Sequence, residues 1–142
     1  MTPRLKLAME HDGPSRGRYV RDLVQQFLKL RSVRGALLVA SDGFVIAAEV
    51  PDSVSVEPLA AMAARLGREL EASAARMGHT SFSTAMFSAE DGGMFVAAAG
   101  IGYVVVLADP QANQEAIRSA VEEAVALIQA AWSPPDGPAS VG

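Results

Sequence analysis

Two apolar runs near the C-terminal end constrain the fold of this chain more than any other feature. Met94–Ala99 and Tyr103–Ala108 are nonpolar throughout and lack the alternation of a strand with one face in water. Strands of this type are covered on both faces. Only Gly100-Ile101-Gly102 separates the runs, and a link this short predicts an antiparallel pair. The pattern therefore indicates a sheet with helices on both sides.

The remaining elements follow from turns and periodicity. Gly35–Ala40 and Phe44–Glu49 flank a Ser-Asp-Gly turn, which predicts a hairpin, and Ser81–Ser88 alternates like a strand. Apolar residues at three- and four-residue steps predict three helices, over about Ser15–Arg31, Ser55–Met77 and Asp109–Trp132. Asp109 is the expected N-cap of the third helix, with Pro110 at its first position. The expected fold class is α/β (α+β), in the order αββαβββα, with a five-stranded antiparallel sheet flanked by helices. The expected domain covers residues 15–132, with a flexible arm over 1–14 and a disordered Pro/Gly-rich tail over 133–142.

Composition excludes several kinds of chemistry. The 142 residues fit one domain, contain no cysteine and include only two histidines, His11 and His79. A disulfide scaffold, a thiolate zinc site and a cysteine nucleophile are thereby excluded, and a Ser/His/Asp triad is disfavoured. There is no Gly-Lys-Ser/Thr loop, so the chain is not itself a P-loop GTPase. We expect a regulatory protein rather than an enzyme, with no catalytic residues, no metal and no cofactor.

Charge and hydropathy restrict the partners. The formal net charge is -4 and the sequence pI is about 5.1. An acidic chain repels polyanions, so no nucleic-acid partner is expected. No apolar run reaches the ~18 residues of a membrane span, so stable membrane insertion is not expected. The N-terminal residues lack the apolar region of a secretory signal, which favours a cytoplasmic protein.

The second expected helix carries small residues where a solvated helix normally carries charges. Its large apolar residues and some alanines share one face, which is expected to lie on the sheet: Leu59, Met62, Ala63, Leu66, Leu70, Ala74 and Met77. Alanines on the opposite side would allow close contact with another helix. The candidate partner-binding residues are Ala61, Ala64, Arg65, Arg68, Ala72, Ala75 and Arg76. The alternative is that alanine is only a good helix former here.

The strand Ser81–Ser88 contains no proline and no charged residue. An edge strand without such protection tends to pair with other chains. Pairing with its own copy across a twofold axis would remove that hazard. The candidate dimer-interface residues are Ser81, Phe82, Ser83, Thr84, Ala85, Met86 and Phe87. The alternative is an edge covered by the N-terminal arm.

The order of elements and several local patterns resemble the Roadblock family over about Tyr19 to Trp132. This family contains the dynein light chains of that name and bacterial relatives of the gliding-protein MglB type. The resemblance rests on Val33–Val39 leading into Ser41–Ala47, on the long Ala-, Leu- and Met-rich helix, and on Gly92–Val96 followed by Tyr103–Leu107. It implies a five-stranded antiparallel sheet between helices and a dimer formed by pairing of edge strands.

The resemblance also implies a function. Bacterial members are linked to small Ras-like GTPases, as activators or scaffolds. We therefore expect a homodimer that binds such a GTPase as an activating partner or as a scaffold. The resemblance implies that any acceleration of GTP hydrolysis works by positioning the GTPase's own residues; an inserted finger from Arg65 or Arg68 is the alternative. Two other classes stay open. One is a structural adaptor without effect on nucleotide turnover, and the other is a small-molecule sensor.

Overall fold

The computed structural model describes residues 16–132, so the arm expected over 1–14 and the tail expected over 133–142 lie outside the described residues. The expected order of elements is confirmed. The elements are α1 (Arg16–Phe27), β1 (Val33–Ala40), β2 (Val45–Glu49), α2 (Val56–Arg76), β3 (Thr84–Ala89), β4 (Gly92–Ala98), β5 (Gly102–Ala108) and α3 (Gln114–Trp132).

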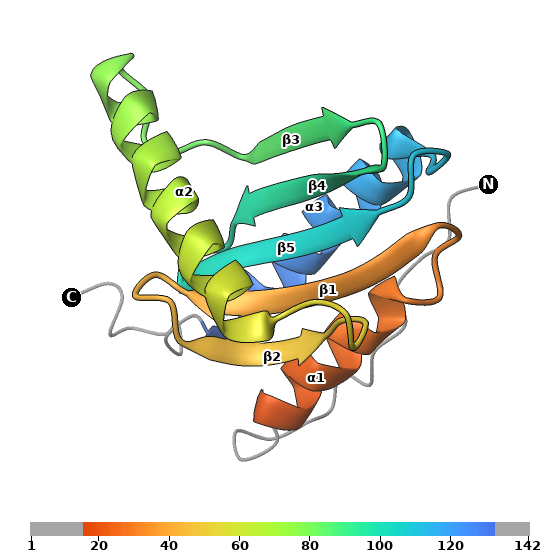
Figure 1. Cartoon of the computed structure of the whole chain (residues 1–142). Coiled ribbons are helices and arrows are strands. Elements are labelled where there is room, and N and C mark those ends of the chain that lie inside the picture. The colour runs from red at the N-terminus through yellow and green to blue at the C-terminus, as the bar shows by residue number, and fades with distance from the viewer. Residues whose placement is uncertain (1–15, 133–142) are drawn as a thin grey trace.

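The five strands form one antiparallel sheet in the order β2-β1-β5-β4-β3 (Figure 1). The short links predicted three antiparallel pairs, and β1–β2, β3–β4 and β4–β5 all have this direction. The interior strands β1 and β5 also pair, with Leu37 opposite Val105. β3 lies at one end of the sheet, as expected of the unprotected strand predicted over Ser81–Ser88.

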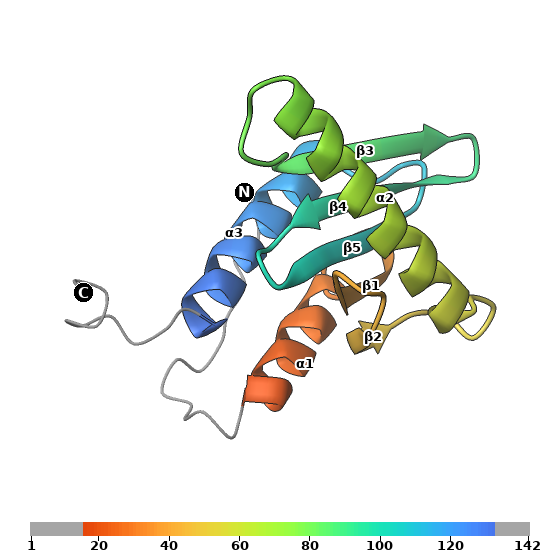
Figure 2. The same ribbon diagram turned by 90° about the vertical axis from the view of Figure 1, so that its left-hand side faces the viewer.

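Helices cover both faces of the sheet, but unequally. Helices α1 and α3 lie side by side on one face, and α2 lies alone on the other (Figure 2). The strands point large residues both ways: Leu38 and Val106 belong to the core under α1 and α3, whereas Leu37 and Val105 belong to the core under α2. This two-sided burial explains why Tyr103–Ala108 shows no alternation.

Helix α3 begins later than the sequence predicts. Asp109 was expected to cap it, but the helix begins at Gln114, and Asn113 Oδ1 accepts the Ala116 N–H at 3.0 Å. Asp109 is engaged elsewhere, because its N–H donates to the Ser32 carbonyl at 2.8 Å and its carboxylate lies 3.6 Å from Arg34 Nε. The expectation of an Asp109 cap was therefore wrong.

The sheet-facing side of α2 also differs from the expectation. The buried residues of α2 are all small: Ala60, Ala63, Ala64, Gly67 and Ala74. Met62 is 45% exposed and Met77 71% exposed, so the expectation that these methionines pack on the sheet was wrong. The reason lies beneath Gly67, where an added Cβ would stand 2.5 Å from the Tyr103 ring. The helix approaches so closely that only small side chains fit between it and the sheet.

Candidate interaction surface

Within residues 16–132, one face of the sheet is only half covered. Helix α2 crosses one half, and no helix of this range lies over the strand ends on the other half (Figure 1). A hollow of about 260 Å³ lies there, lined by residues that include Arg34, Phe87, Met94 and Leu107. Phe87 is 45% exposed, and Met94 and Leu107 are half-buried. The uncovered surface is therefore mainly apolar.

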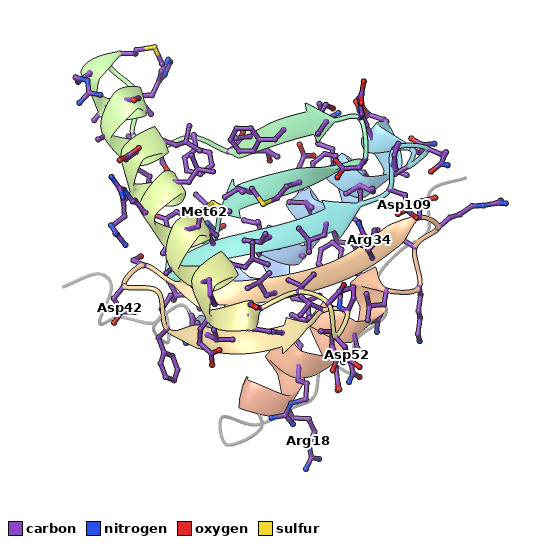
Figure 3. All side chains as sticks on the ribbon, in the orientation of Figure 1. Arg18, Arg34, Asp42, Asp52, Met62 and Asp109 are labelled. Atoms are coloured by element: carbon purple, nitrogen blue, oxygen red, sulfur yellow. The ribbon has the colours of Figure 1, made fainter. Side chains whose placement is uncertain are left out.

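The adjoining flank of α2 is apolar as well. Leu59, Met62 and Leu66 follow each other at helical spacing, so they share one flank. Leu59 and Leu66 are half-buried against the core beneath α2, and Met62 lies on the flank turned toward the uncovered strands (Figure 3). We call this flank together with the uncovered strand ends the apolar groove; its residues are Leu59, Met62, Leu66, Phe87, Met94 and Leu107.

Strand β3 borders the apolar groove and is the edge of the sheet. Within residues 16–132 it pairs with β4 alone, and Thr84–Ala89 contains no charged residue and no proline. Met86 lies opposite Phe95 and Phe87 opposite Met94, so the two exposed side chains point to different faces. The edge thus offers an unused backbone and apolar side chains on both faces.

Only part of the expected dimer interface lies in the strand. Thr84, Ala85, Met86 and Phe87 belong to β3, whereas Ser81, Phe82 and Ser83 precede it. Phe82 turns inward, and its ring stacks on Tyr103 with centroids 6.3 Å apart and 18° between the planes. Ser81 and Ser83 are exposed.

A polar network fixes the loop that enters β3. Tyr103 Oη donates to Glu71 Oε1 at 2.6 Å, and Ser81 Oγ donates to Glu71 Oε2 at 3.3 Å. Burial, followed by the bond to Glu71, raises the pKa of Tyr103 to about 12. Glu71 thus joins α2, β5 and the loop. The sequence analysis missed this network. Two sequence features could have indicated it: one tyrosine in a strand of valines, and one glycine inside a long helix.

The expected partner-binding residues divide into two groups. Ala61, Arg65, Arg68, Ala72, Ala75 and Arg76 are exposed on the side of α2 away from the sheet. Ala64 is only 1% exposed and packs against the sheet, so its assignment to the outer surface was wrong. All three arginines have partners: Arg65 Nε lies 3.5 Å from a carboxylate oxygen of Glu69, Arg68 Nη1 donates to the Ser41 carbonyl, and Arg76 Nη2 donates to Ser73 Oγ at 3.2 Å.

Other chemical sites do not emerge from residues 16–132. No group of three His, Asp or Glu side chains in this range could hold a metal ion, and none of its helices is long and apolar enough to cross a membrane. Asp42 serves a turn, because its Oδ1 accepts the Phe44 N–H at 3.1 Å. Gly100, with φ of 84°, belongs to the turn between β4 and β5.

Comparisons with known proteins agree with this geometry. A family model described as the Roadblock/LC7 domain matches residues 19–108. Two uncharacterized proteins of Methanocaldococcus jannaschii, MJ1340 and MJ0310, are each 34% identical to the chain over 102 residues, 72% of this chain and 90% of each relative.

Three solved structures illustrate the similarity of fold. The gliding protein MglB of Thermus thermophilus has a TM-score of 0.70 at 21% identity, covering 89% of this chain and 95% of that one. Myxococcus xanthus MglB gives 0.73 at 15% identity, covering 78% and 92%. A Roadblock/LC7 domain from Streptomyces avermitilis gives 0.66 at 23% identity, covering 76% and 89%. At these identities the likeness concerns the fold.

Proposed function

The chain belongs to the Roadblock/LC7 domain family, and on that premise we propose that it is a homodimeric regulator of a small Ras-like GTPase. One observation carries the proposal: the free edge of β3 and the apolar groove are exposed side by side. A second copy of the chain can cover both the edge and the groove, because a twofold axis brings the same surfaces of the two copies together.

The dimer forms by pairing of two β3 strands into a continuous sheet. Backbone groups at the edge gain hydrogen bonds, and the exposed side chains of Phe87 and Met62 become buried away from water. The two α2 helices then lie near the axis, each over the groove of its partner. The small side chains beneath α2 hold the helix close to its own sheet, so its apolar flank stays available.

Dimerisation creates the partner surface. The outer sides of both α2 helices, each with Ala61, Arg65, Ala72 and Arg76, form one platform that a monomer lacks. One GTPase contacts both copies and is recognised in one nucleotide state, because its switch regions differ between states. Since Arg68 is bonded to the Ser41 carbonyl and Arg65 lies next to Glu69, the contacts favour positioning of the GTPase's own residues over an inserted finger.

The dimer is tested by replacing Phe87 with Asp. Sedimentation equilibrium of the wild type is expected to show twice the mass of the chain, and the variant to dissociate at least about thirtyfold more readily, as expected for a central interface residue. The matched control is Leu28→Asp, an exposed residue just after α1, which is expected to leave the mass unchanged. A wild type that remains monomeric at high concentration would contradict the proposal.

The GTPase partner is tested by nucleotide dependence. Each Ras-like GTPase encoded in the same genome is purified, loaded with GDP or with a non-hydrolysable GTP analogue, and titrated with the wild-type dimer. The proposal expects one GTPase to bind, with a clear preference for one nucleotide. Equal affinity for both forms would indicate the structural adaptor instead, and no binding by any of them would exclude the GTPase partner.

A further inference from the structure

The turn between β1 and β2 carries the most exposed aromatic side chain of residues 16–132. Phe44 is 69% exposed, compared with 45% for Phe87. A scattered exposed apolar residue needs no explanation by itself. Phe44 differs because its backbone is held in place by several independent contacts.

The turn is internally rigid. The Gly43 N–H donates to the Ala40 carbonyl at 2.9 Å, and the Ala40 N–H donates to the Phe44 carbonyl at 2.8 Å. Asp42 Oδ1 accepts the Phe44 N–H at 3.1 Å. Gly43 has φ of 96°, a value that glycine adopts without strain. The backbone around Phe44 is therefore fixed before any partner arrives.

The turn is also attached to α2. The guanidinium of Arg68 donates to the Ser41 carbonyl, a bond between residues 27 positions apart. At Gly43 an added Cβ would lie 3.8 Å from the Cα of Ala61, so turn and helix are in close proximity. Asp42 lies at this turn, at the same end of the strands that α2 crosses (Figure 3). The turn thus continues the outer surface of α2.

We infer that Phe44 is an anchor residue of the partner surface and that Arg68 is the positioning residue that holds it against α2. The inference rests on the proposed function, and the occupant is the same Ras-like GTPase. Aromatic side chains are frequent among the residues that dominate interface energetics, and one carried on a fixed backbone loses less conformational freedom on binding. The GTPase is expected to offer an apolar socket for the ring, with an N–H donor or a basic side chain facing the Asp42 carboxylate.

The direct test compares Phe44→Ala with Leu28→Ala in titrations of the dimer with the loaded GTPase. Phe44→Ala is expected to raise Kd by about thirtyfold or more, the range of interface hot spots, with the mass of the dimer unchanged. Leu28→Ala is expected to bind like the wild type. Unchanged affinity of Phe44→Ala would overturn the inference, as would loss of the dimer, which would place the ring in contact with the second copy instead.

The role of Arg68 is tested with Arg68→Ala against Arg65→Ala. Arg68→Ala is expected to speed hydrogen exchange of the amides in residues 40–45 and to weaken GTPase binding, whereas Arg65→Ala leaves exchange in the turn unchanged. The decisive measurement is the rate of GTP hydrolysis by the GTPase at a saturating concentration of the dimer. A roughly thousandfold fall in that rate with Arg68→Ala, with affinity retained, is the signature of an arginine finger and would overturn the positioning role.

The two proposals fail in different ways. If the wild type binds no GTPase in either nucleotide state, the proposed function and this inference both fall. If the wild type binds one and Phe44→Ala binds it equally well, only the inference falls.

Discussion

The two faces of the sheet in this molecule are built from the same strands but are covered by helices in different ways. Under α1 and α3, large side chains such as Leu23, Phe27 and Ile128 fill the space between helices and sheet. Under α2, alanines and one glycine bring a single helix close, and no other helix of the described residues covers the rest of that face. The closed face supplies most of the core. The half-open face leaves an apolar groove beside a free edge, which is the combination that an interaction surface needs.

The largest expected change in the free energy of unfolding distinguishes the side of α2 that faces the sheet from its outer side. Ala64→Glu places a charge at a position that is 1% exposed against the sheet, whereas Ala72 is exposed. Ala64→Glu is expected to lower the free energy of unfolding by at least about 4 kcal/mol, because a buried charge without a partner is among the most damaging changes. Ala72→Glu is expected to change it by no more than about 0.5 kcal/mol.

Urea unfolding followed by circular dichroism measures both variants. If Ala72→Glu folds normally and fails to bind the GTPase, the outer side of α2 is a binding surface rather than a structural one. Equal stability of the two variants would remove the distinction between the sides.

A smaller effect tests the close approach of α2. Gly67→Ala places a methyl group 2.5 Å from the Tyr103 ring, which must shift or push the helix away. The clash is expected to outweigh the gain in helix propensity and to cost about 1–2 kcal/mol of unfolding free energy. The control is Gly17→Ala in the first turn of α1, where no described residue lies within 4 Å of the added Cβ and a gain of up to about 1 kcal/mol is expected. A stabilised Gly67→Ala would show that the helix has room to move.

The smallest effect concerns the hydroxyl of Tyr103. Tyr103→Phe removes the donor to Glu71 and is expected to cost about 1 kcal/mol at neutral pH. In the folded chain the pKa of Tyr103 is raised to about 12, while an unfolded tyrosine ionises near its ordinary value of 10.0. The contribution is therefore complete below pH 10 and is lost as the pH rises toward 12.

Denaturant titrations between about pH 7 and about pH 11.5 measure this dependence. The wild type is expected to lose stability above pH 10 more steeply than Tyr103→Phe. Parallel curves would show that the buried hydroxyl does not couple folding to pH.

The sequence predicted three of the four strand pairings because those three join strands that follow each other in the chain, whereas β1 and β5 are distant in sequence. Gly100 and Gly102 bound a link too short for anything but an antiparallel turn, and the unguarded residues of β3 marked an edge. The sheet-facing side of α2 was predicted only in part: Ala63 and Ala74 are buried as expected, whereas Met62 and Met77 are exposed. Periodicity weights large side chains, but contact with Tyr103 selects small ones. Asp109 resembles a helix cap in sequence but is engaged by Arg34 and Ser32 from distant parts of the chain.

The candidate surface was predicted only in part for the same reason. The outer residues of α2 and the strand Thr84–Phe87 have local signatures, namely small or uncharged residues where charges are expected. The apolar groove has none, because Phe87 and Leu107 become neighbours only when β3, β4 and β5 assemble. The bond from Arg68 to Ser41 likewise joins two elements whose contact no spacing reveals.

The absence of a side chain at Gly67 restricts how the sequence of this chain can evolve. Because the ring of Tyr103 occupies the space that any Cβ at position 67 would need, the two positions are expected to vary as a pair. A larger residue at 67 becomes tolerable once the aromatic ring at 103 is replaced by something smaller, and each single exchange alone passes through a less stable intermediate sequence.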